Sequence, residues 1–213
     1  MGDTVPRMVA EFILVFFALP VAFAFVKIPG GPIPILLVLC IAVAFSFRRA
    51  RDFDRRDLWR PSALRPALPS ILRLWALAAV VAVAAVGLFD RSHLFDLPRH
   101  NPGLWVLIVV AYPIVSVYPQ ELLFRAFLLH RYRTLLRNDR IAAATSAVSF
   151  ALAHLLFGNP VAVALTLVGG WLFARRYQRT RSLLTVGVEH AAYGLLIFTV
   201  GLGRFFYHGP DFG

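Results

Sequence analysis

Seven long apolar segments constrain the fold of this chain more than any other feature of its sequence. A transmembrane helix needs about 20 consecutive, predominantly apolar residues. The segments cover residues 8–26, 33–47, 71–89, 104–130, 141–157, 160–177 and 183–203. The sequence therefore predicts an all-α protein, a polytopic transmembrane helix bundle of about seven spans, in which residues 1–213 form a single integral membrane domain.

The composition excludes the soluble classes of protein. Hydrophobic residues make up 59% of the 213 residues, charged residues make up 15%, and the mean hydropathy is +0.72. The formal net charge is +11. The charged residues lie between the apolar segments and do not alternate with aromatic residues, so we expect no binding of nucleic acid. Cys40 is the single cysteine, which excludes an internal disulfide and a metal site with several thiolates.

The arginines follow the pattern that seven alternating spans predict. Cytoplasmic loops of membrane proteins retain an excess of Lys and Arg. The three loops expected on the cytoplasmic side contain Arg48, Arg49, Arg51, Arg55, Arg56, Arg60, Arg65 and Arg73, then Arg131, Arg133, Arg137 and Arg140, then Arg175, Arg176, Arg179 and Arg181. The opposite side contains only Lys27, Arg91, Arg99 and Arg204. We therefore expect the N-terminus in the cytoplasm and the C-terminus in the periplasm.

Three ionisable side chains from different spans are expected at a similar depth. At a helical rise of about 1.5 Å per residue, Glu121 lies roughly 15 Å from the cytoplasmic boundary of its span. By the same measure, His154 lies roughly 20 Å and His190 roughly 14 Å inside their spans. Ionisable groups are costly in lipid and normally face the interior of a bundle or a water-filled cavity. The coincidence in depth predicts one shared polar site.

Local spacing refines this prediction. Glu121 and Arg125 are four residues apart, so they share a helix face and can form an ion pair. Phe150 and His154 have the same spacing, so the ring can pack beside the imidazole. Pro119 lacks a backbone donor, and we expect it to loosen the helix beside the polar groups.

Three motifs in the second half of the chain carry a resemblance to a known family. They are Gln120-Glu121 with Arg125, the stretch FALAH that ends at His154, and the stretch EHAAYG that begins at Glu189. In order and spacing they resemble the CPBP intramembrane proteases, the CAAX prenyl protease and bacteriocin-processing group. The family pattern is Glu-Glu-x-x-x-Arg, Phe-x-x-x-His and His-x-x-x-Asn on successive helices.

The resemblance implies an intramembrane endopeptidase with a catalytic core over residues 104–203. The first three spans match the family only in being hydrophobic. In such enzymes the first Glu and the first His are thought to activate water, and the second His and the Asn to stabilise the oxyanion. Carried over by position, the residues expected to be catalytic are Glu121, Arg125, His154 and His190.

Two positions depart from the family pattern. Gln120 stands in place of the first Glu, and Gly194 stands in place of the Asn. Either Glu121 has become the base or the peptidase activity has been lost, and Glu189 could also return a carboxylate to the site. We favour retained activity, because nothing else would offset the cost of burying so many ionisable groups.

In the mechanism that we expect, Glu121 takes a proton from water, His154 holds that water, and His190 donates to the developing oxyanion. We assign Gln120, Phe150 and Glu189 to substrate binding, and we expect Gln120 to supply the amide donor in place of the missing Asn. No cofactor and no metal ligand are assigned. The main mechanistic alternative is a zinc site with two His and one Glu, and the non-enzymatic alternative is a membrane scaffold or a transporter-like relic.

The expected partners are the lipid bilayer and a membrane protein or peptide as substrate. The small size and the frequent use of Ala and Arg suggest a multi-pass protein of a bacterial inner membrane. Prenylated CAAX proteins are not expected as substrates there. A peptide, a lipoprotein or the tail of a sorting signal is the more plausible target.

Overall fold

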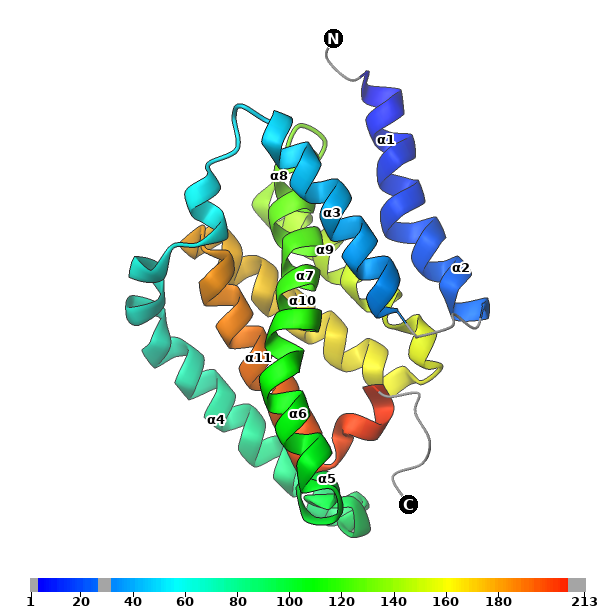
Figure 1. Cartoon of the computed structure of the whole chain (residues 1–213), viewed down its shortest axis with the longest axis vertical. Helices are drawn as coiled ribbons and strands as arrows, with labels where there is room; N and C mark the ends of the chain where they lie inside the picture. The colour runs from blue at the N-terminus through cyan, green and yellow to red at the C-terminus, as the bar shows by residue number, and fades with distance from the viewer. Residues whose placement is uncertain (1–3, 27–31, 207–213) are drawn as a thin grey trace.

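The computed structural model describes residues 4–26 and 32–206, and these residues form a bundle of helices without strands (Figure 1). The α-helices are α1 (Val5–Ile13), α2 (Leu19–Phe25), α3 (Ile33–Arg49), α4 (Leu64–Phe89), α5 (Asp96–His100), α6 (Pro102–Tyr112), α7 (Tyr118–Glu121), α8 (Leu128–Arg131), α9 (Asp139–Ala153), α10 (Pro160–Thr180) and α11 (Leu183–Val200). Three π-helical turns continue the α-helices, namely η1 (Leu14–Ala18), η5 (Pro113–Val117) and η6 (Leu122–Phe127). Short 3-10 turns are η2 (Arg55–Leu58), η3 (Pro61–Ala63), η4 (Arg91–His93), η7 (Leu155–Phe157) and η8 (Leu202–Phe206).

Five of these helical segments are long and apolar enough to cross a membrane, among the residues that the structure describes. They are Val5–Phe25, Pro61–Phe89, Pro102–Arg131, Asp139–Phe157 and Leu183–Val200. The chain is therefore a polytopic helical membrane protein, as predicted, although length and composition support five candidate spans and not about seven. The other two expected segments are helices as well, but α3 has only 17 residues and the 21 residues of α10 end in a charged stretch.

The outer surface of α4 has the character of a lipid-facing helix. Val80 is 68% exposed, Leu88 is 79% exposed and Phe89 is 89% exposed. A water-soluble protein rarely leaves so many large apolar side chains together on its surface. In a bilayer the same side chains contact acyl chains, which are as apolar as they are.

Side-chain caps and a left-handed glycine define the ends of the helices that build the site. Asn138 accepts hydrogen bonds from the first backbone N–H groups of α9, Asn159 caps α10 and Ser182 caps α11. These caps satisfy N–H groups that have no partner within the helix. Gly201 ends α11 with a φ of 103°, a conformation that side chains with a Cβ rarely adopt.

Helices α9 and α10 approach each other closely at a glycine. A Cβ atom at Gly170 would lie 2.9 Å from the Cα atom of Ala147 and 3.3 Å from the Phe150 ring. Because Gly170 has no side chain, the backbones of the two helices can lie this close together. The contact holds Phe150 in place at the centre of the bundle, where it is 1% exposed.

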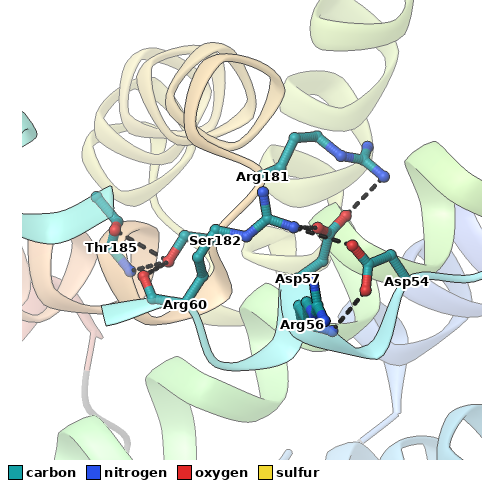
Figure 2. A network of polar contacts seen from close by, with 7 residues as sticks. All are labelled: Asp54, Arg56, Asp57, Arg60, Arg181, Ser182 and Thr185. Atoms are coloured by element: carbon teal, nitrogen blue, oxygen red, sulfur yellow. Dashed lines mark hydrogen bonds and ion pairs between the residues drawn. The ribbon is translucent and has the colours of Figure 1, made fainter. Parts of the chain in front are cut away.

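A buried carboxylate fastens the loop after α3 to the corner between α10 and α11. Figure 2 shows Asp57 between two arginines: its Oδ1 lies 2.7 Å from Arg60 Nη2, and its Oδ2 lies 2.6 Å from Arg181 Nη2. Ser182 Oγ also donates to the carbonyl oxygen of Arg60 at 3.0 Å. Burial raises the pKa of the Asp57 carboxyl despite the opposing effect of both arginines. This network connects two of the three loops that were expected on the cytoplasmic side.

The third of these loops joins the same end of the bundle. Arg133, in the turn after α8, donates to Asp52 Oδ2 at 2.6 Å. Figure 1 shows this turn and the loop after α3 at one end of the molecule, with α5 at the opposite end. The arginine-rich loops thus lie toward one end of the bundle, and their assignment to the cytoplasmic side stays a prediction. Lys27, one of the basic residues expected on the other side, lies outside the described residues.

We expect Asp57→Asn to release the arginine-rich loop. The substitution removes the charge that holds Arg60 and Arg181, whose side chains are themselves 33% and 46% exposed, so water compensates part of the loss. A loss of about 1–2 kcal/mol would raise the population of the open loop about 5- to 30-fold. Trypsin should therefore cleave after Arg56 faster in the detergent-solubilised variant. Asp54→Asn is the control, because Asp54 is 53% exposed, and an equal effect there would contradict the role of Asp57.

Candidate active site

The helix that carries Glu121 changes its hydrogen-bonding pattern on both sides of this residue. The π turn η5 begins at Pro113 and the π turn η6 begins at Leu122, so α7 with Glu121 lies between them. A loosened helix was predicted near Pro119, which lies in α7. Single π turns within helices are frequent at functional sites.

Glu121 and Arg125 form an ion pair that is entirely buried. Their side chains are both 0% exposed, and Glu121 Oε2 lies 3.2 Å from Arg125 Nε, which confirms the pairing predicted from their spacing. Arg125 Nη1 donates to Ser146 Oγ of α9 at 2.8 Å. The guanidinium also lies 4.7 Å from the centre of the Phe150 ring. The pair thus links the α7–α8 helix to α9 at the centre of the bundle.

His190 of α11 completes the environment of Glu121. His190 Nδ1 lies 2.8 Å from Glu121 Oε1, and because a carboxylate only accepts hydrogen bonds, Nδ1 is assigned the proton. In the neutral imidazole, Nε2 is then an acceptor, and it lies 3.2 Å from the hydroxyl oxygen of Tyr112. The ring stacks on Phe173 with 4.6 Å between the ring centres. Glu121 and His190 were predicted to meet from their depth, and the contact confirms it.

His154 lies at the end of α9, beside the same aromatic cluster. Its Nδ1 donates to the carbonyl oxygen of Phe150 at 2.8 Å. The Phe150 ring centre is 4.6 Å from the His154 ring and 5.6 Å from the His190 ring, so the predicted packing of Phe150 on His154 is confirmed. Within the described residues, no hydrogen bond joins His154 to Glu121 or His190. The ring centre of Phe206, in η8, lies 6.1 Å from the ring centre of His154.

Gln120 presents an acceptor without a protein partner. Its Nε2 donates to Ser116 Oγ at 2.7 Å, whereas its Oε1 is buried and accepts no hydrogen bond from the described residues. A buried acceptor without a partner is costly unless water or a ligand pairs with it. Gln120 Oε1 is therefore available to a water molecule or to the amide of a bound peptide.

Glu189 is engaged elsewhere in the bundle. Its two oxygens accept from Arg176 Nε and Nη2 at 2.8 and 3.0 Å, and its side chain is 1% exposed. Arg176 also donates to Ser70 Oγ of α4 at 2.8 Å. The carboxylate of Glu189 thus joins α10, α11 and α4, and its assignment to substrate binding stays a prediction.

Tyr112 is the residue at this site that sequence reasoning missed. It is the last residue of α6, nine positions before Glu121 on the same continuous helical segment, and it contacts His190 through its hydroxyl group. Its ring lies 5.6 Å from the Phe198 ring, at an interplanar angle of 73°. A tyrosine within the apolar stretch VLIVVAYPIVSV gives no signal of this contact, because the contact depends on how α6 and α11 pack.

The donor set does not fit the zinc alternative. Among the described residues, no three His, Cys, Asp or Glu side chains are grouped so that they could hold a metal ion. Glu121 and His190 contact each other, but His154 is attached to the Phe150 carbonyl group.

Fold and site together define a polytopic membrane protein with a buried cluster of Glu, Arg and His at its centre. Residues 101–196, somewhat less than half of the chain, match the family described as Rce1-like, Type II CAAX prenyl endopeptidase. This match agrees with the resemblance found in the sequence motifs. The matched segment contains every residue of the site discussed above except Ser70, Phe198 and Phe206.

A second comparison points to a different protein. Over 146 residues, or 63% of this chain, the sequence is 32% identical to a polyprenol-phosphate-mannose-dependent alpha-(1-2)-phosphatidylinositol mannoside mannosyltransferase of Mycobacterium tuberculosis (strain ATCC 25618 / H37Rv). The chain spans about a third (33%) of the length of that relative. No solved structure matches the chain.

Proposed function

We propose that this protein is an intramembrane endopeptidase that hydrolyses a peptide bond of a membrane-associated protein or peptide. The observation that carries the proposal is the contact between the buried carboxylate of Glu121 and His190 Nδ1 at 2.8 Å. A carboxylate that accepts from one imidazole nitrogen fixes the tautomer and stabilises the imidazolium, so that the other nitrogen can accept a proton. The match of residues 101–196 to an endopeptidase family supports the same reaction.

The geometry favours His190 as the group that takes the proton from water. Glu121 was expected to do this directly, but it is 0% exposed and its two oxygens face His190 and Arg125. In the proposed reaction His190 Nε2 accepts a proton from water, and the oxygen of that water bonds to the carbonyl carbon of the substrate. The imidazolium then gives its proton to the leaving nitrogen as the C–N bond breaks. The products are a carboxylic acid and an amine.

Three further residues keep supporting roles in the proposal. Gln120 Oε1 accepts a hydrogen bond from the attacking water or from the substrate amide, since it is buried without a partner among the described residues. His154 Nε2 is available for the same water, because its Nδ1 is already bonded to Phe150. Arg125 compensates the negative charge of Glu121 in both states of His190.

The proposed substrate lies in or on a bacterial inner membrane, with the N-terminus of the protease in the cytoplasm and its C-terminus in the periplasm. The description of the matching family names CAAX prenyl endopeptidases. In a bacterium we expect instead the apolar tail of a peptide, lipoprotein or sorting signal, and a test must include both kinds of substrate. A scaffold or transporter without peptidase activity is the outcome if neither is cleaved.

The test is a peptidase assay with purified protein in lipid vesicles. The probes are internally quenched peptides, one set with an apolar transmembrane tail and one farnesylated peptide with three residues after the modified cysteine. We expect cleavage by the wild type and a fall of about 10²- to 10⁴-fold for His190→Ala, the range typical of a lost acid–base group. Equal cleavage by both proteins, or none by the wild type, would contradict the proposed function. Total metal analysis of the active preparation tests the zinc alternative separately.

A further inference from the structure

We propose that the hydroxyl group of Tyr112 donates the hydrogen bond that stabilises the oxyanion, and that Gly194 is the residue that admits it to the site. The inference rests on the proposed peptidase function. It assigns a catalytic role to a residue that lies in none of the three sequence motifs.

Gly194 and Tyr112 occupy one space together. A Cβ atom at Gly194 would overlap the hydroxyl oxygen and the Cε1 atom of Tyr112, and it would lie 2.6 Å from Cζ. These atoms belong to a rigid phenol group and not to the end of a flexible chain, so any side chain at position 194 would exclude Tyr112 from its present position. Gly194 has no such side chain, so Tyr112 can lie against α11 (Leu183–Val200) about one helical turn after His190.

The hydrogen bonds around His190 define what the tyrosine hydroxyl does. His190 Nδ1 donates to Glu121, so the neutral ring accepts at Nε2, and the Tyr112 hydroxyl is the donor to it at 3.2 Å. A hydroxyl hydrogen can rotate about the C–O bond while its oxygen stays in place. Tyr112 can therefore direct the same hydrogen to another acceptor near His190 without moving its ring.

A substrate carbonyl oxygen is that second acceptor. When it lies beside Tyr112, the hydroxyl hydrogen turns toward it, and the lone pair of His190 Nε2 becomes available to water. Water gives its proton to Nε2 and forms the C–O bond, and the electrons of the carbonyl double bond move to the oxygen that Tyr112 faces. A donor already in place where charge develops stabilises the transition state more than the ground state. Breaking the C–N bond returns those electrons and transfers the Nε2 proton to the leaving nitrogen.

The Gly194 position also explains a departure from the family pattern noted in the sequence. The pattern has an Asn there, which the resemblance assigns to the oxyanion, and this chain has no side chain to replace it. The hydroxyl group of Tyr112 lies within the volume that a side chain at 194 would occupy. In this chain the donor that we propose and the volume that it fills therefore belong to Tyr112 at the end of α6, whereas the family pattern has them in the Asn side chain of α11.

The first experiment removes only the hydroxyl group. Tyr112→Phe retains the ring and its contact with Phe198, so folding should be unchanged, and kcat in the vesicle assay should fall about 10²-fold with a smaller change in KM. The matched control is Tyr118→Phe, because the Tyr118 hydroxyl donates to the Leu58 carbonyl oxygen at 3.4 Å and takes no part in the proposed reaction. A Tyr112→Phe variant with the kcat of the wild type would overturn the inference.

The second experiment removes the Tyr112 side chain from α6 and places a side chain of similar volume at position 194 of α11. Gly194→Asn alone should destabilise the protein because the new side chain meets the Tyr112 ring, and Tyr112→Ala with Gly194→Asn should relieve this clash. Tyr112→Ala with Gly194→Leu fills similar space without a donor. We expect kcat to be at least about 10-fold higher for the double variant with Asn at position 194 than for the one with Leu. This is smaller than the usual effect of a natural oxyanion donor, because the new Asn is not optimally placed. Equal kcat values for the two pairs would overturn the inference.

The results separate this inference from the proposed function. If His190→Ala is inactive and Tyr112→Phe is fully active, the peptidase function stands and the role of Tyr112 is wrong. If the wild type and His190→Ala behave alike on every probe, the peptidase function fails and the role of Tyr112 fails with it.

Discussion

Glu121→Gln is expected to lower cleavage of the vesicle-bound peptides by about 10²- to 10⁴-fold. It also leaves Arg125 buried without its charged partner, so activity is compared only in preparations of the variant that remain folded. Glutamine keeps the shape of the side chain but loses the charge that stabilises the protonated His190 across the 2.8 Å contact. The loss is expected whether Glu121 supports His190 or takes the proton itself. The measurement is kcat/KM in the reconstituted assay, with circular dichroism of the same preparation to confirm that helix content is retained.

Two other substitutions of neighbouring residues make this result specific. Glu189→Gln changes an equally buried carboxylate that is bonded to Arg176, and we expect much less loss of activity there. Gln120→Glu restores the family residue, but in an enzyme organised around Glu121 it adds a second buried carboxylate near the first, so no gain in activity is expected. A large gain would indicate that the wild type is a relic whose function depended on the lost Glu. Unchanged cleavage by Glu121→Gln would move the carboxylate role to another residue.

The sequence predicted those parts of the structure that depend on local geometry. Most helices begin and end within a few residues of the apolar segments, because hydropathy and caps such as Asn138 and Ser182 act over one or two turns. The exception is α4, which begins at Leu64, seven residues before the predicted segment. Pairs four residues apart, Glu121 with Arg125 and Phe150 with His154, contact each other because the α-helix fixes that spacing. The similar depths of Glu121 and His190 in their spans were sufficient to predict that these two residues meet.

The contacts that sequence reasoning missed depend on rotation of the helices about their axes. Depth along a helix does not reveal which way a side chain points, so Glu189 could not be assigned to Arg176 or excluded from the site in advance. The same holds for Tyr112, whose hydroxyl reaches His190 only because α6 and α11 are packed face to face beside Gly194. The span count differed for another reason: α10 is a full helix, but its last turns carry arginines that bind Glu189 and Gln178.

Arg125→Met is expected to be among the most destabilising single changes in this chain, at about 3–5 kcal/mol, the usual cost of leaving one member of a buried ion pair behind. Glu121 would stay in the centre of the bundle, 0% exposed, with His190 as its remaining polar partner. Ser146 Oγ would lose the guanidinium that donates to it. The measurement is the free energy of unfolding of the protein in mixed micelles of a mild detergent and SDS.

A double variant and a surface control decide whether the cost comes from the unpaired charge. Glu121→Leu with Arg125→Met removes both charges and fills the space with apolar atoms, so much of the stability should return, although cleavage should not. Arg133→Met breaks a pair with Asp52 in which both side chains are more than half exposed, and its effect should stay within about 1 kcal/mol. If Arg125→Met is as mild as Arg133→Met, Glu121 must be uncharged in the folded protein. A neutral Glu121 could not stabilise the imidazolium of His190, so this stability measurement also tests the proposed mechanism without any substrate.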